Sequence, residues 1–384
     1  MNDFTQLSVC SYLDGTDLDR ARTMAAEDPT ISQRDIYHAA CAGDAAAVRW
    51  FLDVDASLVN SRGGYFDWQP LMYACYSRVN LPQYSTLEVA RVLLEHGADP
   101  NAYYMWGQQY RFTALTGVFG EGENGPKNNP EHPLCPEFAR MLLEAGADPN
   151  DGQALYNRMF TPGHSCLKLL LEFGLSPEHK NNWLVHDAGG NLQPNEMQVL
   201  RSQLNWAIKS RYLKRALLLI DSGADLSELD GEKPLFEMAM LAGVPELAEH
   251  LVRHGAERVE LPDTSLFVAA CMAADRETAE GLLGNSPDLV QRTQVAQPEL
   301  VILAAETGCY AAIRLMAALG VDLCFHGSPL HATAWHGDLK MVQLLVELGV
   351  DPAARDAVHN ATAADWAEHR GGREEIKAYL NSLN

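Results

Sequence analysis

The chain has few basic residues for its length. Its 384 residues include 29 lysines and arginines against 51 aspartates and glutamates, so the formal net charge is -22 at pH 7. Nucleic acids and anionic lipid surfaces would repel a protein of this charge. We therefore expect no nucleic-acid partner and no membrane partner, whereas a neutral or basic protein partner is compatible with the charge.

Long apolar runs are also missing. No stretch approaches the roughly 18 consecutive apolar residues of a membrane-spanning helix. The start, MNDF at residues 1–4, has neither the basic residues nor the apolar core of a signal peptide. We interpret the chain as cytoplasmic, and secretion through a signal that is not legible in the sequence stays an alternative.

The eight cysteines show no C-x-x-C spacing. Cys41, Cys75 and Cys271 lie beside small residues in a recurring pattern, where a buried thiol packs well. Thiols of a cytoplasmic protein stay reduced, and their spacing does not match a known metal site. We expect structural cysteines without disulfides, no metal site and no cofactor.

Motifs of well-known catalytic chemistry are absent too. The sequence contains no G-x-S-x-G, H-E-x-x-H, G-x-x-x-x-G-K-[ST] or G-x-G-x-x-G. His186-Asp187 would suit a base and the group that orients it, but no nucleophile accompanies the pair, so a structural role is favoured. His331 and His336 are five residues apart, a spacing that does not put both on one helical face. We predict no catalytic residue and no enzyme.

The chain does contain a repeated phrase. Residues 328–337 read SPLHATAWHG and lead into LKMVQLLVELGVDP at residues 339–352. Weaker copies include QPLMYAC at 69–75 with VLLEHGADPN at 92–101, and TAL at 113–115 with LLEAGADPN at 142–150. Further copies fall at 39–52, 153–174, 216–225, 233–256, 264–270 and 304–322, and degenerate ones at 17–22 and 361–383.

Each letter of the phrase has a physical reason. Proline after serine or glutamine ends a turn and begins a short first helix. Paired alanines keep one face thin enough for neighbouring units to stack. A V-x-x-L-L stripe gives the second helix one buried face. Gly43 and Gly337 separate the two helices, and Gly97 and Gly349 follow the second helix, where a left-handed residue is favoured.

The S-P-L-H start at residues 328–331, in units that recur at a period near 33 residues, resembles the T-P-L-H-x-A start of the ankyrin repeat. The resemblance covers nearly the whole chain and implies an all-α solenoid of about eleven helix-turn-helix units with short hairpin-like connections. Departures from the period indicate insertions at 78–85, 120–136 and 181–200. We expect N-terminal ankyrin repeats over 1–180, an irregular insertion over 181–200 that is a hinge or a break, and C-terminal repeats with a cap over 201–384.

The resemblance also implies a concave binding surface, formed by the hairpin tips and the outer face of the first helices. Two adjacent tips, YFDW at 65–68 and YYMWGQQYR at 103–111, are aromatic where polar turn residues are usual. Exposed tyrosine, tryptophan and arginine dominate interface energetics. We predict these partner-binding residues: Tyr65, Phe66, Trp68, Tyr73, Tyr76, Arg78, Tyr103, Tyr104, Trp106, Tyr110, Arg111, Trp335 and His336.

The function that we infer is a non-enzymatic protein-protein interaction module, a scaffold that holds a neutral or basic protein in the groove of the N-terminal half. Alternatives are an immunity or inhibitor protein, a secreted host-directed effector and, with less support, an enzyme with a site between the tips and the insertions. A structural alternative also exists for the aromatic tips, which can pack on one another or against residues 120–136.

Overall fold

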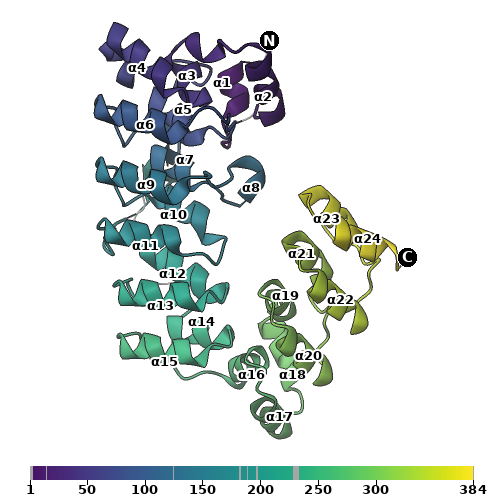
Figure 1. The fold of residues 1–384 in the computed structure, drawn as a ribbon. Coiled ribbons are helices and arrows are strands. Elements are labelled where there is room, and N and C mark those ends of the chain that lie inside the picture. Colours follow the sequence, from purple (N-terminus) through teal and green to yellow (C-terminus); the bar gives the residue numbers. More distant parts are fainter. Residues whose placement is uncertain are drawn as a thin grey trace. The chain divides into compact units, whose positions relative to one another are not determined.

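The computed structural model describes residues 3–13, 15–123, 125–180, 183–187, 189–195, 198–227 and 233–383. Short helices dominate these residues, with two small two-stranded sheets (Figure 1). No helix among them is long and apolar enough to cross a membrane. The fold is a mostly helical repeat fold, as the sequence predicts, whereas the number of units stays a prediction.

The chain divides into two compact units. Unit 1 is Met1–Leu204 with Asp221–Asp225, and unit 2 is Asn205–Ile220 with Leu226–Asn384. The boundary at residue 204 falls inside one helix, α12. Up to this helix the elements are α1 (Phe4–Ser8), α2 (Leu18–Glu27), η1 (Ile31–Gln33), α3 (Ile36–Ala42), α4 (Ala45–Val54), η2 (Ala56–Asn60), α5 (Pro70–Tyr76), α6 (Thr86–Glu95), β1 (Tyr103–Trp106), β2 (Tyr110–Thr113), α7 (Ala114–Phe119), α8 (Gly125–Asn128), α9 (Cys135–Glu144), α10 (Gly152–Met159), α11 (Ser165–Glu172), β3 (Leu184–His186), β4 (Leu192–Pro194) and α12 (Val199–Lys209).

The remaining elements are all helices. They are α13 (Leu213–Asp221), α14 (Leu235–Leu241), α15 (Pro245–Arg253), α16 (Asp263–Met272), α17 (Arg276–Asn285), α18 (Leu289–Ala296), α19 (Leu300–Glu306), α20 (Tyr310–Ala318), α21 (Pro329–His336), α22 (Leu339–Glu347), α23 (Ala363–Arg370) and α24 (Glu374–Asn381). One hydrophobic core cluster runs from α16 to α24, and α20 and α22 each bury one apolar stripe in it.

Helix pairs stack in succession within unit 1. The first helices α3, α5, α7 and α10 contact one another in order, and the second helices α4 and α6 contact each other (Figure 1). Helix α5 begins with proline at its first turn, and α6 is capped by Ser85. Val89, Val92 and Leu93 form the fully buried stripe of α6. The local signals in the sequence therefore act as expected here.

The repeat turns need glycine at defined places. Gly43 has φ of 85°, and a Cβ atom there would lie 3.0 Å from the backbone of Ser85, so both conformation and space exclude a side chain. In α21, the Nε2 atom of His331 lies 2.9 Å from the Ala361 carbonyl, and Nδ1 lies 3.3 Å from the Ser328 carbonyl. The structural role predicted for His331, which serves the backbone of the turn, is confirmed.

Asparagine side chains tie successive tips together in unit 1. Asn60 donates to the Gly97 carbonyl at 2.9 Å and accepts from the amide of Asp99 at 2.9 Å. Asn101 repeats the pattern, donating to the Gly146 carbonyl at 3.0 Å and accepting from the amide of Asp148 at 2.8 Å. Hydrogen bonds between repeats therefore hold the tips, and they fix the spacing of the side chains on successive tips.

The insertions contribute structure of their own. Residues 78–85 lie between α5 and α6, and residues 120–136 lie between α7 and α9 and contain α8. In the third insertion, residues 181–182, 188 and 196–197 lie outside the described ones, and β3 and β4 pair antiparallel. The amide of Leu184 donates to the Gln109 carbonyl at 3.0 Å, so this hairpin lies against the loop of β1 and β2. Whether the insertion acts as a hinge stays a prediction.

Candidate functional site

The long second tip forms an antiparallel hairpin of β1 and β2. Tyr104 pairs with Phe112, and Met105 pairs with Arg111. Because side chains alternate along a strand and paired residues share a face, the hairpin has two distinct faces. We define the inner face as Tyr104, Trp106, Tyr110 and Phe112, and the outer face as Tyr103, Met105, Arg111 and Thr113.

The inner face packs into an aromatic cluster. The ring of Tyr104 lies between Trp68 and Phe112, with ring centroids 4.7 and 5.2 Å away. Tyr76 completes the contact, 5.3 Å from Trp68 and 5.7 Å from Tyr104. Such pairs add packing energy beyond the area they bury. The cluster therefore fixes the hairpin rigidly on unit 1.

Four of the predicted binding residues are buried, so our expectation that they are exposed is wrong. Trp68, Tyr73, Tyr76 and Tyr104 retain 3%, 0%, 0% and 5% of their accessible surface. Two of them also bind the backbone, since the hydroxyl of Tyr73 donates to the Gly63 carbonyl at 2.8 Å and that of Tyr76 to the Thr113 carbonyl at 2.9 Å. The aromatic residues that the sequence brings together do cluster, but these four pack internally.

Arg78 is also not a surface residue. Its guanidinium is buried and donates to the carbonyls of Pro130, Gly117, Cys75 and Ser77, at distances between 2.6 and 3.0 Å. Burial lowers the pKa of Arg78 to about 10, so the group is still charged near neutral pH. Arg78 joins the insertion 120–136 to the repeat helices, and its predicted contact with a partner is not supported.

The other predicted residues of unit 1 do reach the surface. Tyr65, Tyr103 and Trp106 are exposed, together with Met105, which the sequence analysis did not select. Phe66, Tyr110 and Arg111 are half-buried. The inner edge of this group is anchored, since the ring of Tyr110 lies 5.5 Å from Trp106 and 5.1 Å from Trp183.

Trp335 and His336 belong to unit 2 and form a separate feature. Half-buried Trp335 packs against Trp366 and His369 at centroid distances of 5.9 and 6.2 Å, with the guanidinium of Arg370 over its ring. His336 is exposed, and its Nε2 atom lies 3.9 Å from a Glu306 carboxylate oxygen. Partial desolvation, together with the nearby guanidinium groups of Arg370 and Arg373, lowers the pKa of His336. The structure gives these two residues contacts within the C-terminal helices.

A groove of about 550 Å³ runs along strand β1 of the hairpin. Tyr103 and Met105 of the outer face and Tyr104 of the inner face line it from the hairpin, and Phe66 and Arg62 line it from the first tip. Arg62 Nε lies 3.2 Å from a carboxylate oxygen of Asp67, and both side chains are exposed. The groove therefore has aromatic and apolar walls with an open ion pair at one edge, a lining typical of a recognition surface.

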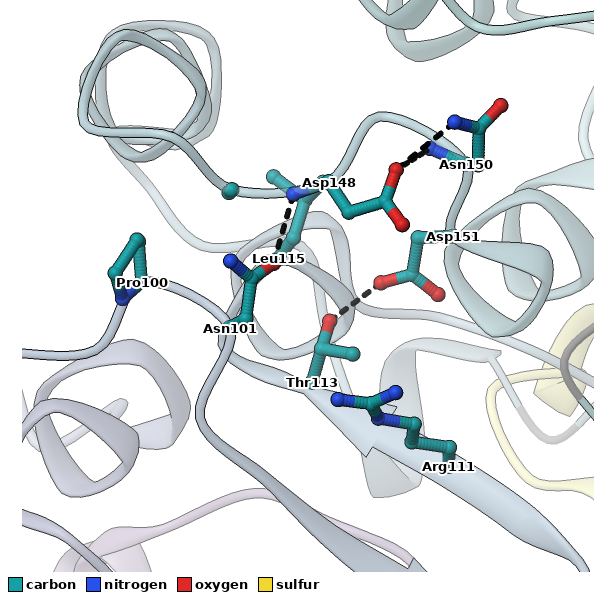
Figure 2. A pocket seen from close by; sticks show the side chains of 9 residues that line it. Pro100, Asn101, Arg111, Thr113, Leu115, Asp148, Asn150 and Asp151 are labelled. Carbon is teal, nitrogen blue, oxygen red and sulfur yellow. Dashed lines mark hydrogen bonds between the residues drawn. The ribbon is translucent and has the colours of Figure 1, made fainter.

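A second, smaller pocket of about 190 Å³ lies beneath the hairpin (Figure 2). Its lining residues come from the two tips that follow α6 and α9, from β2 and from the start of α7, and they are Pro100, Asn101, Arg111, Thr113, Leu115, Ala147, Asp148, Asn150 and Asp151. The guanidinium of Arg111 stacks on the ring of Tyr103, 4.0 Å from its centroid. Since Arg111 lines the pocket and Tyr103 lines the groove, this stacked pair borders both.

Asp151 closes the inner end of the pocket. Its buried carboxylate accepts hydrogen bonds from the hydroxyls of Thr113 and Thr116 and from the amides of Gln153 and Ala154 at the start of α10. Burial raises the pKa of this carboxyl, and the hydrogen bonds oppose the rise. Asp151 therefore caps α10 and fixes the floor of the pocket.

Among the described residues of unit 1 taken alone, no three histidine, cysteine, aspartate or glutamate side chains place ligand atoms close enough together to share an ion. The dipeptide His186-Asp187 does not form a pair either, because Nδ1 of His186 lies 3.0 Å from the Gly190 carbonyl and Asp187 accepts from the amides of Gly189 and Asn191.

Comparison with known proteins agrees with the repeat pattern. The family model for the ankyrin repeat matches residues 67–103 and 327–357. The chain is also 45% identical over 84 residues to a protein of Pyrobaculum aerophilum described as an ankyrin repeat protein. That alignment covers 21% of this chain and 32% of the relative, so the chain spans about a third of the relative's length. Together with the stacked helix pairs, these matches show that the chain contains ankyrin repeats and is similar to ankyrin-repeat proteins.

Proposed function

We propose that the protein is a non-enzymatic interaction module that binds a protein partner across the outer face of the β1–β2 hairpin. The observation that carries the proposal is the exposed pair of Tyr103 and Met105 on this face, which lines a groove of about 550 Å³. Ankyrin-repeat proteins generally mediate protein-protein interactions. An exposed apolar patch that borders a groove is a common mark of such a contact.

Rigidity supports this surface as a binding site. The inner face of the hairpin is locked by the cluster around Tyr104, and the tips are tied by Asn60 and Asn101. A surface that is already ordered loses little conformational freedom when a partner binds, so more of the contact energy appears as affinity. The exposed side chains on the outer face of the hairpin are therefore presented in a fixed arrangement.

Charge defines the class of partner. With a net charge of -22, the chain attracts positively charged proteins over long distances and repels acidic ones. We propose a neutral or basic protein partner and a cytoplasmic setting. The residues proposed to contact it are those that reach the surface of unit 1: Tyr65, Phe66, Tyr103, Met105, Trp106, Tyr110 and Arg111.

Affinity capture with the intact chain and a Tyr103→Ala, Met105→Ala double variant tests this function. We expect the variant to lose its partner, since truncation of an interface anchor typically costs about 2 kcal/mol or more. Its melting temperature should stay close to wild type, because exposed substitutions usually change stability by less than about 0.5 kcal/mol.

Trp50→Ala is the matched control, since Trp50 is a large exposed side chain on α4, outside the groove. Quantitative mass spectrometry of the captured proteins gives the measurement. If the double variant and the control retain the same proteins as wild type, the outer face of the hairpin does not bind the partner and the proposal fails.

A further inference from the structure

The polar groups of the pocket beneath the hairpin are nearly all satisfied (Figure 2). Asn101 uses both ends of its amide on the neighbouring tip. Asn150 accepts from the amide of Ser176 at 2.9 Å and donates to Asp148 at 2.9 Å. Asp151 accepts four different donors. These side chains fix the shape of the pocket and leave little capacity for a ligand.

Arg111 differs from the others. Within the described ranges, the guanidinium of Arg111 stacks on the ring of Tyr103, and its buried Nε atom has no hydrogen-bond acceptor. A guanidinium carries five N–H donors and no acceptor. A buried donor without a partner is unfavourable, and more so when it is charged. The pocket therefore has free volume beside a guanidinium whose hydrogen-bond donors are not all satisfied.

We propose that this pocket receives the carboxylate of an acidic side chain from the protein partner, bound by Arg111. The inference rests on the proposed function and adds the chemistry of one anchor contact. The planar guanidinium matches a carboxylate with two parallel hydrogen bonds. Because Tyr103 covers one face of the guanidinium, its edge is left for this in-plane contact.

The surroundings favour a carboxylate over a more highly charged anion. Asp148 and Asp151 line the same pocket, and Asp148 is exposed at its mouth. A phosphate group carries up to about two negative charges at neutral pH, so these carboxylates would repel it more strongly than a singly charged ligand. The neighbouring groove gives a chain that continues past the anchor a path along Tyr103 and Met105.

A local acidic contact is compatible with a partner that is neutral or basic as a whole. Long-range attraction depends on the net charge of both proteins and is screened beyond about 10 Å at 0.1 M salt. A single ion pair in a pocket acts at contact distance and decides which residue fits. The net charge therefore selects for the overall charge of the partner, whereas the pocket selects for one of its side chains.

The test is selection of random 12-residue peptides displayed on phage against the intact chain, followed by titration of the enriched peptides in solution. We expect the peptides to share an aspartate or glutamate at a fixed distance from an apolar residue. Arg111→Gln should weaken binding by about tenfold or more, the effect of losing a charge-assisted hydrogen-bonded pair. Arg91→Gln is the matched control, because Arg91 pairs with Glu88 on the exposed side of α6.

A double-mutant cycle with a glutamine in place of the acidic peptide residue completes the measurement. If Arg111 binds that residue, the peptide change should have little further effect in the Arg111→Gln variant. Peptides that lack a carboxylate but lose binding with Tyr103→Ala, Met105→Ala would overturn the acidic anchor and leave the proposed function standing. Absence of enrichment, or equal binding by all variants, would contradict both.

Discussion

Two buried side chains show how single residues hold the insertion 120–136 in place. Arg78 donates to the carbonyls of Pro130 and Gly117, and His132 lies in contact distance of Thr86 and Leu134. The amide of Leu134 donates to Nδ1 of His132 at 3.1 Å, so Nε2 carries the proton and donates to the Thr86 hydroxyl at 3.0 Å. This arrangement requires the neutral imidazole.

Stability should therefore depend on the charge of His132. Burial, together with the nearby Arg78, lowers the pKa of His132 from 6.5 to about 3. The unfolded chain binds a proton below about pH 6.5 and the folded chain does not, so stability is fully present above that pH and is lost as the pH falls toward 3. Between pH 7 and pH 5 we expect a loss of about 2 kcal/mol from this residue.

Urea unfolding at pH 7 and pH 5 measures the effect, with His132→Gln as the comparison. The variant should be less stable than wild type at pH 7 but should lose about 2 kcal/mol less on acidification. Equal losses in the two proteins would show that His132 is protonated in the folded state. Other titrating groups are common to both proteins, so they cancel in the difference.

At the scale of elements, the hairpin β1–β2 separates packing residues from surface residues by alternation along the strand. Tyr103 and Tyr104 are neighbours with the same side chain, yet Tyr103 keeps 42% of its accessible surface and Tyr104 keeps 5%. Truncation of a buried aromatic residue typically costs about 3–5 kcal/mol. Tyr104→Ala should therefore lower the melting temperature by many degrees, whereas Tyr103→Ala should change it little.

Thermal unfolding followed by circular dichroism distinguishes the two faces. A similar melting temperature for both variants would mean that the hairpin does not pack as described. Tyr104 was predicted from the sequence as a partner-binding residue, but its burial makes it a packing residue of the hairpin. A double variant that includes Tyr104 is therefore unsuitable for a binding test.

The sequence predicted this element in part. The length and aromatic content of residues 103–111 indicated an unusual tip, and a period of two could have separated Tyr103 and Met105 from Tyr104 and Trp106. Which face turns inward depends on Trp68 and on Tyr12, whose ring lies 5.4 Å from Phe112. These partners come from distant segments, so local pattern does not identify them.

At the scale of the whole molecule, repeated local signals predicted the helices well, because each ankyrin unit contacts its neighbours in the chain. Contacts between distant segments were not predicted. Val9 forms an antiparallel bridge with Ser77, and the amide of Arg78 donates to the Ser8 carbonyl at 2.9 Å. These contacts join the N-terminal segment to the start of the insertion 78–85, and no residue of the repeat pattern predicts them.

The net charge of -22 is a property of the whole chain, and it should make stability depend on salt. Like charges repel one another more in the compact state than in the extended one, and salt at 0.1 M screens this repulsion beyond about 10 Å.

The exposed ion pairs, such as Arg62 with Asp67, each stabilise the fold by less than about 1 kcal/mol and are weakened by the same salt. Because acidic residues outnumber basic ones by 51 to 29, at least 22 acidic side chains have no lysine or arginine to pair with, so the repulsion is the larger effect. The melting temperature should therefore rise by a few degrees between 10 and about 300 mM sodium chloride. An equimolar series with a neutral solute controls for crowding, and a melting temperature that falls with salt would show that ion pairs outweigh the repulsion.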